Sequence, residues 1–94
     1  MQVWFKVLDW PELIQVLGKR EFSVIFQGAT IQDLIQTLLK QYGPPLAHLL
    51  FDAQGRMNKT VQFIVSGKLC GREVDAFTLK EGDRVALVVQ LEGG

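Results

Sequence analysis

The stretch GATIQDLIQTLLKQYG, residues 28–43, decides how this 94-residue chain can fold, because it is the clearest helix in the sequence. Thr30 is a favourable N-cap residue, and Asp33 three positions later makes a variant of the capping box. Gly43 can take the left-handed C-cap, and the two prolines that follow it end the helix. The apolar residues of this helix recur at helical spacing and form one stripe that must be buried against another layer: Ile31, Leu34, Ile35, Leu38, Leu39 and Tyr42.

On both sides of this helix the apolar residues alternate with a period of two, which is typical of strands that bury one face. Residues 2–8 and 20–27 precede the helix, and residues 60–66 and 84–91 follow it. Weaker signals indicate a helical turn or loop at 11–18, a turn of helix at 46–51 and a short strand around 73–78. We expect these strand residues to point inward: Val3, Phe5, Val7, Phe22, Val24, Phe26, Val61, Phe63, Val65, Val85, Leu87, Val89 and Leu91.

Two strands, a crossing helix and further strands predict an α+β fold with a mixed sheet of four to five strands. One main helix, about residues 30–42, should pack on one face of this sheet. This is the β-grasp (ubiquitin-like) arrangement, in which the last strand lies centrally beside the first. The length fits a single domain over residues 1–94, and we expect a flexible C-terminal Gly-Gly tail at 92–94 that projects from its body.

The composition excludes several classes of function. Ten Lys and Arg residues balance ten Asp and Glu residues, so there is no electrostatic case for binding nucleic acid or an anionic membrane. The apolar runs are too short to span a bilayer, and the first residues do not have the pattern of a secretory signal. The single cysteine, Cys70, cannot form an internal disulfide, and we therefore expect a cytoplasmic protein.

No constellation of side chains predicts catalysis, metal binding or cofactor binding by this chain alone. Cys70 has no recognisable base beside it, and the only histidine, His48, has no companions at the spacing of metal ligands. The glycines form neither a dinucleotide-binding nor a phosphate-binding pattern, so we expect no bound ATP.

The sequence ends with Gly93 and Gly94, directly after the predicted strand at 84–91. One interpretation is a frayed terminus without a role. The other is that the carboxylate of Gly94 is the reactive group, and that glycine is used because it lets the tail thread into an enzyme.

Several segments together resemble the MoaD/ThiS sulfur-carrier family over essentially the whole chain. They are LIQVLGKREFSV, the helix GATIQDLIQTLLKQYG, FIVSGKL, LKEGDRVALV and the final Gly-Gly. The sequence departs from the family pattern at Ser66, where asparagine is common, and at residues 89–92, VQLE, where MoaD proteins often carry small residues and proline. This ending is closer to that of ubiquitin-like modifiers.

The resemblance implies a chemical role for the tail. A ubiquitin-activating-type enzyme would adenylate the Gly94 carboxylate, using ATP and magnesium that belong to the enzyme, while Gly93 threads the tail. A sulfur donor, such as a cysteine desulfurase or a rhodanese-type protein, would then convert the carboxylate to a thiocarboxylate. Because the resemblance is strongest to MoaD, the small subunit of molybdopterin synthase, it also implies a larger catalytic subunit that receives the tail in molybdenum cofactor biosynthesis.

The second face of the predicted sheet carries apolar side chains that a single helix cannot cover. Such a patch usually marks a partner surface, although scattered apolar surface or self-association would also account for it. Trp4 should contribute most to docking, as aromatic anchors do. The predicted partner-binding residues are Trp4, Leu8, Ile25, Ile64, Ala86 and Val88, with Leu91 and Glu92 at the start of the tail.

Two other functions remain open. The first is a ubiquitin-like protein modifier, or a sulfur carrier for another pathway such as thiamine or cysteine synthesis or tRNA thiolation. The second is a passive β-grasp interaction module in which Gly93 and Gly94 have no role.

Overall fold

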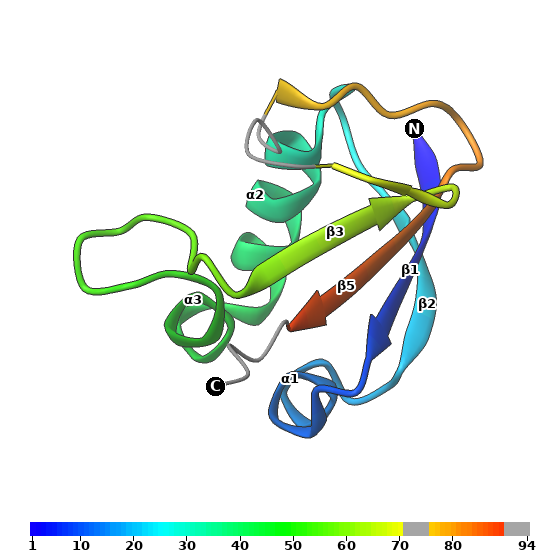
Figure 1. The fold of residues 1–94 in the computed structure, drawn as a ribbon. Helices are drawn as coiled ribbons and strands as arrows, with labels where there is room; N and C mark the ends of the chain where they lie inside the picture. The colour runs from blue at the N-terminus through cyan, green and yellow to red at the C-terminus, as the bar shows by residue number, and fades with distance from the viewer. Residues whose placement is uncertain (71–75, 90–94) are drawn as a thin grey trace.

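The computed structural model describes residues 1–70 and 76–89 of the chain (Figure 1). The predicted short strand at 73–78 therefore falls partly outside the described residues, and within 76–78 only Thr78 makes an isolated bridge, to Thr30. The elements, in chain order, are β1 (Gln2–Leu8), α1 (Pro11–Leu17), β2 (Glu21–Ile25), α2 (Ile31–Tyr42), α3 (Pro44–Leu50), β3 (Val61–Val65), β4 (Lys68–Leu69) and β5 (Arg84–Val89).

The strands form one mixed sheet with the order β2-β1-β5-β3-β4. β1 is antiparallel to β2 and parallel to β5, and β3 is antiparallel to both β5 and β4. The last strand thus lies in the centre beside the first, which confirms the predicted β-grasp arrangement. The short strand β4 continues β3 through a two-residue Ser66-Gly67 turn, in which both residues have positive φ (47° and 89°). Such a turn matches the twist of a hairpin.

The N-terminus of α2 is built as the sequence predicts. The Thr30 hydroxyl accepts a hydrogen bond from the Asp33 backbone N–H at 3.2 Å, and the Asp33 carboxylate accepts from the backbone N–H groups of Thr30 and Ala29 at 3.1 and 2.9 Å. These bonds satisfy backbone donors that a helix leaves without partners. Gly28 is required here, because its φ is 125° and a β-carbon would collide with the Asp33 side chain.

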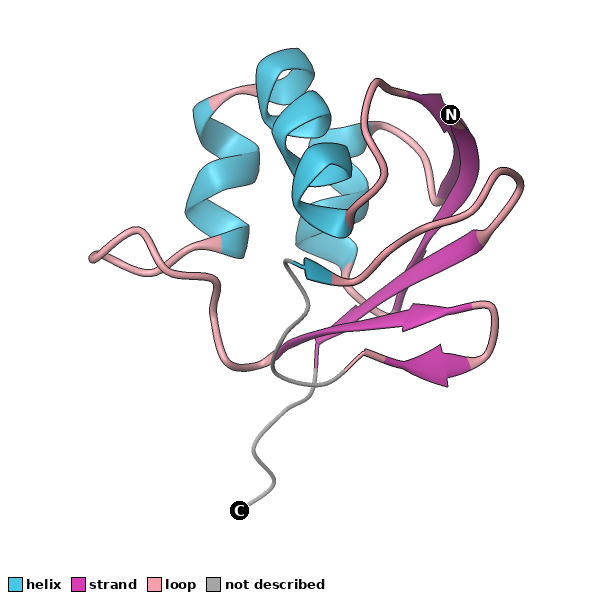
Figure 2. Ribbon diagram, turned by 90° about the horizontal axis from the view of Figure 1, so that it is seen from above, coloured by secondary structure: helices cyan, strands magenta, loops and turns pink. Residues whose placement is uncertain are grey.

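Two short helices join α2 on the same face of the sheet (Figure 2). α1 begins with Pro11 and ends at Gly18, whose φ of 80° and ψ of −1° give a left-handed cap. α3 begins at Pro44, earlier than the predicted turn at 46–51, because the first helical positions do not need the N–H that proline lacks. Gly43 separates α2 from α3 with φ 71° and ψ −153°, so it is not the predicted left-handed C-cap.

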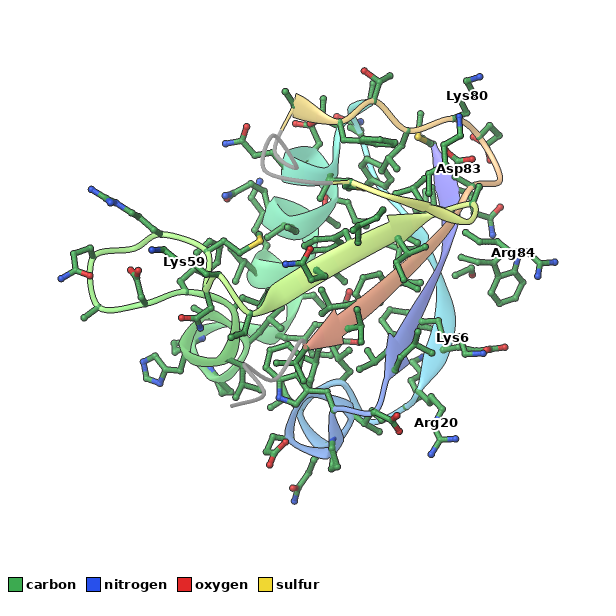
Figure 3. The ribbon with its side chains drawn as sticks, viewed as in Figure 1. Lys6, Arg20, Lys59, Lys80, Asp83 and Arg84 are labelled. Carbon is green, nitrogen blue, oxygen red and sulfur yellow. The ribbon has the colours of Figure 1, made fainter. Side chains whose placement is uncertain are left out.

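The loop between α3 and β3 stands away from the sheet, and it carries Lys59 on the opposite side of the molecule from Lys6 and Arg84 (Figure 3). Asp52 organises this loop, since its carboxylate accepts hydrogen bonds from the backbone N–H groups of Gln54 and Arg56 at 2.9 and 3.0 Å. The loop therefore offers exposed charges that are remote from the sheet's central strands.

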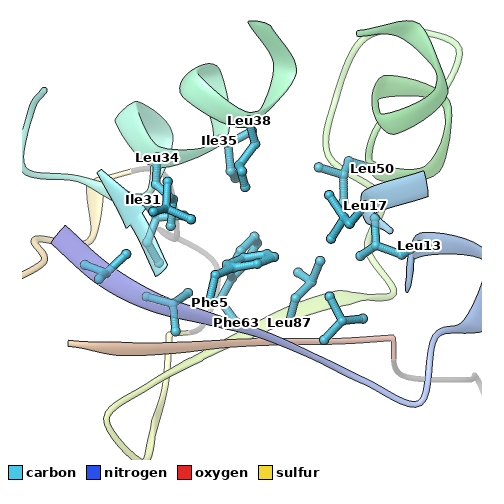
Figure 4. Close-up of a cluster of buried hydrophobic side chains, with 14 of the residues drawn as sticks. Phe5, Leu13, Leu17, Ile31, Leu34, Ile35, Leu38, Leu50, Phe63 and Leu87 are labelled. Atoms are coloured by element: carbon cyan, nitrogen blue, oxygen red, sulfur yellow. The ribbon is translucent and has the colours of Figure 1, made fainter. Parts of the chain in front are cut away.

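The core lies between the helices and the inward face of the sheet (Figure 4). Phe5, Phe63 and Leu87 come from three neighbouring strands and are at most 2% exposed. They meet side chains from all three helices: Leu13, Leu17, Ile31, Leu34, Ile35, Leu38, Leu46 and Leu50. Every predicted inward residue within the described part of the chain is buried except Val89, which is partly buried, and Leu91 lies outside the described residues.

Candidate functional site

The face of the sheet that points away from the helices is uncovered by any described element (Figure 2). Six of the predicted docking residues lie on this open face, contributed by four strands: Trp4, Leu8, Ile25, Ile64, Ala86 and Val88. The side chains of Trp4 and Ile25 are 52% and 74% exposed, and the other four are partly buried. Strand alternation thus predicted the face correctly.

The register between strands decides which of these residues meet. Ala86 on β5 lies opposite Ile64 on β3, and Val88 lies opposite Leu8 on β1. These four residues therefore form a continuous apolar area over the central strands. Ile25 does not belong to it, because it lies opposite Gln2 near one corner of the sheet.

One apolar residue of this face was missed from the sequence. Leu69 on β4 lies opposite Ile64 and is 65% exposed, so it extends the apolar area to the edge of the sheet. The signal was available: a two-residue Ser-Gly turn between apolar segments is typical of a hairpin. It places Lys68 opposite Val65 and so turns Leu69 towards the open face.

Charged residues divide the open face near Trp4, and the sequence did not single them out as a group. Arg84 lies opposite Trp4, and Lys6 lies opposite both Glu21 and Ala86. Lys6 Nζ is 3.8 Å from Glu21 Oε2, with both side chains at least half exposed, so this ion pair contributes less than about 1 kcal/mol to stability. Around these residues the surface forms a hollow of about 330 Å³, lined by Trp4, Phe5, Lys6, Glu21, Arg84, Val85 and Ala86.

The predicted reactive tail follows the central strand. β5 runs towards the end of the molecule where α1 and α3 lie, and its last residue is Val89 (Figure 1). The predicted site residues Leu91, Glu92, Gly93 and Gly94 lie outside the described residues. The structure therefore describes the platform that precedes the tail.

The remaining candidate side chains do not gather into a site. Burial raises the pKa of the Cys70 thiol, so it is protonated and a weak nucleophile at neutral pH. His48 is exposed on α3. Across residues 1–70 and 76–89, no three His, Cys, Asp or Glu residues are placed to hold a metal ion. In the same ranges, no helix has the length and apolar content needed to cross a membrane.

The central parallel pair β1–β5, the capped helix on one face and the open opposite face define a ubiquitin-like β-grasp protein. The sequence model of the ThiS family matches residues 11–94. The chain therefore belongs to the ThiS family, a family of sulfur carriers and ubiquitin-like small modifiers.

Solved structures share this fold at low sequence identity. SAMP1 from Haloferax volcanii matches with a TM-score of 0.79 at 23% identity, with 100% of each chain covered. Molybdopterin converting factor subunit 1 from Pyrococcus furiosus, a putative assignment in that structure's own description, matches with a TM-score of 0.71 at 21% identity, covering 97% of this chain and 99% of that one. Urm1 from Trypanosoma brucei matches with a TM-score of 0.69 at 22% identity, covering 99% and 95%. A comparison with curated proteins finds no match.

Proposed function

We propose that this chain is a sulfur carrier whose reactive group is the carboxylate of Gly94. The observation that carries the proposal is the match to the ThiS family, which extends through residue 94 and so includes both glycines. The fold supports it, because the central strand β5 leads into residues 90–94 and the open face beside β5 is free to hold a partner. The proposal makes Gly94 the C-terminal residue.

The chemistry requires an activating enzyme. A carboxylate is a poor electrophile because it is negatively charged and stabilised by resonance. A ubiquitin-activating-type enzyme would join it to AMP from ATP, with magnesium and with release of pyrophosphate. The terminal sulfur of a cysteine persulfide on a cysteine desulfurase or a rhodanese-type donor would then displace AMP and form an acyl disulfide with Gly94. A second thiol would reduce this disulfide, which releases the thiocarboxylate on Gly94 and leaves a disulfide with the donor cysteine.

The two glycines suit this role for a physical reason. A residue without a β-carbon has free backbone dihedrals and the smallest cross-section, so it can enter a narrow channel. Ordering each such residue costs about 1–2 kcal/mol of conformational entropy. Contacts on the folded body must offset that cost, and the open face provides the apolar area for them.

As the recipient of the sulfur we propose the larger catalytic subunit of a molybdopterin synthase, with this chain as the small subunit. The support is the resemblance over the whole chain to MoaD proteins and the shared fold with molybdopterin converting factor subunit 1. The larger subunit would bind the open face and receive the tail.

A second candidate is a ubiquitin-like modifier that is joined through Gly94 to lysines of other proteins. The specific observation in its favour is the match to SAMP1, a small archaeal modifier protein, over the full length of both chains. The Leu91-Glu92 ending before the glycines also favours it.

Intact-mass analysis of the protein purified from its native host tests the proposal. Thiocarboxylation adds roughly 16 Da, and fragmentation must place the added mass on Gly94, because oxidation of methionine or cysteine adds about the same mass. A Gly94 that stays a carboxylate after incubation with the host activating enzyme, ATP and a sulfur source would refute the sulfur-carrier role. Co-purification of a larger synthase subunit supports the molybdopterin branch, whereas higher-mass conjugates that carry the Gly94 remnant on lysine support the modifier.

A further inference from the structure

The hollow on the open face exists because a small residue stands among long ones. Ala86 has only a methyl group, whereas Lys6 lies opposite it on β1, and Arg84, two residues earlier on β5, lies opposite Trp4. The floor consists of the β1 and β5 backbone at Phe5 and Val85, whose side chains are buried on the other side of the sheet. The result is a recess with an aromatic wall and charged rims.

The charge of this recess is positive. Of its three charged residues, Lys6 and Glu21 pair with one another at 3.8 Å. Arg84 has no carboxylate within 4.0 Å among the residues that the structure describes. A guanidinium presents a rigid fork that matches a carboxylate with two parallel hydrogen bonds. Figure 3 shows Lys6 and Arg84 projecting from the same side of the molecule.

We infer that this recess is a socket for an aspartate or glutamate side chain of the activating enzyme. The carboxylate would bind Arg84 and Lys6, and its methylene groups would contact the indole of Trp4. This inference rests on the proposed function and deepens it by stating the chemistry of the partner surface. Charge complementarity is the reason for choosing an acidic group.

The position of the socket on β5 would let it orient the carrier on the activating enzyme. Arg84 begins β5 and Val89 ends it, five residues later. At about 3.3 Å per residue, the socket lies roughly 17 Å from Val89, the last residue of β5. An enzyme that holds both points must lie along β5, and this alignment directs the tail towards its ATP site.

Pyrophosphate exchange by the activating enzyme of the same organism, measured with the carrier concentration varied, tests the socket. We expect Arg84→Glu to raise the KM for the carrier at least ten-fold with kcat unchanged, because Arg84 would contact the enzyme surface and stands ten positions before the reacting Gly94 in the sequence. Glu21→Gln should lower KM at least two-fold, since it releases Lys6 for the partner. Arg56→Glu is the matched control in the remote loop and should leave KM within two-fold. High salt should reduce the difference between Arg84→Glu and the wild type.

The outcomes separate the socket from the function. If the wild-type chain supports no exchange, the proposed function fails and the socket falls with it. If the wild type is adenylated and Arg84→Glu has an unchanged KM, the socket is wrong and the function stands. A lower KM for Arg84→Glu with a higher KM for Glu21→Gln would show a basic partner surface and overturn the inference.

Two further measurements distinguish the loss of a socket contact from unfolding and from self-association. Circular dichroism must show the wild-type melting temperature for Arg84→Glu; if it does not, Arg84→Gln takes its place, with the same expected direction. Sedimentation must show a monomer. A wild-type dimer that Arg84→Glu dissociates would mean that a second copy of this chain covers the recess, which would overturn the inference.

Discussion

Trp4→Ala is the substitution that tests most directly whether the open face binds the activating enzyme. The Trp4 side chain is 52% exposed. A tryptophan offers about 200 Å² to burial, so about 100 Å² remains for a partner to cover. At about 25 cal/mol per Å², covering that area contributes about 2.5 kcal/mol, or roughly 70-fold in affinity. Losses from ordering side chains reduce this figure, and we expect a KM for the carrier that is ~10- to 70-fold higher.

The same substitution should leave the fold nearly intact, because Trp4 points away from the core. We expect it to lower the free energy of unfolding by about 1 kcal/mol or less. Phe63→Ala is the contrasting control: Phe63 is 2% exposed in the centre of the core, and its truncation should cost about 3–5 kcal/mol. Among the molecules that remain folded, Phe63→Ala should keep the wild-type KM.

The assay is pyrophosphate exchange at a temperature where both variants are folded, together with thermal unfolding followed by circular dichroism. A KM for Trp4→Ala within two-fold of wild type would refute docking through this face. A loss of stability as large as that of Phe63→Ala would instead make Trp4 a structural residue, and the surface argument would fail.

Three further predictions concern the fold. Gly28→Ala should lower the free energy of unfolding by more than about 1 kcal/mol, because Gly28 has a φ of 125° and a β-carbon there would meet the Asp33 carboxylate. Gly55 has a φ of 80° with open space around it, so Gly55→Ala should lower the free energy of unfolding by less. Urea titration of both variants measures the difference. Hydrogen bonds from the backbone N–H groups of Ala29 and Thr30 hold the pKa of Asp33 below its usual 3.8. This stabilisation is therefore present above about pH 4 and lost as the pH falls through the folded-state pKa. Asp33→Asn should therefore weaken the dependence of the free energy of unfolding on pH below about pH 4. An unchanged dependence in that range would count against the capping role. Cys70, whose pKa is raised by burial, should react with iodoacetamide at pH 7.5 more slowly in the folded protein than in urea, and equal rates would contradict its partial burial.

The features that the sequence predicted are those fixed by local pattern. The period of α2 and its capping box depend on residues within four positions of one another, as with Thr30 and Asp33. The inward and outward faces of the strands follow from simple alternation, because one face of the sheet had to be buried. These signals were enough to predict the β-grasp fold and six apolar residues of the open face, although Leu69 was missed.

The features that the sequence did not predict depend on register between distant segments. The hollow exists because Trp4 lies opposite Arg84, 80 positions further along the chain, and because Lys6 lies opposite both Glu21 and Ala86. No local pattern specifies these pairs. The same limit explains Ile25: alternation placed it on the correct face, but only the register shows that Gln2 is its neighbour and that the apolar area lies elsewhere.

A single open face has a consequence for how the proposed carrier works. In the proposed function the activating enzyme and the recipient subunit would both need the tail, and both would contact the apolar area around Ile64, Ala86 and Val88. The two partners must therefore bind in turn, and neither can hold the carrier so tightly that exchange becomes slow. The open face suits such weak binding, because it combines half-buried apolar residues with the weak Lys6–Glu21 pair. Its charges supply specificity, and the face does not need a large, fully apolar interface. A substitution that strengthens binding to the activating enzyme, such as Glu21→Gln, should then slow the overall transfer of sulfur even as it lowers KM for adenylation.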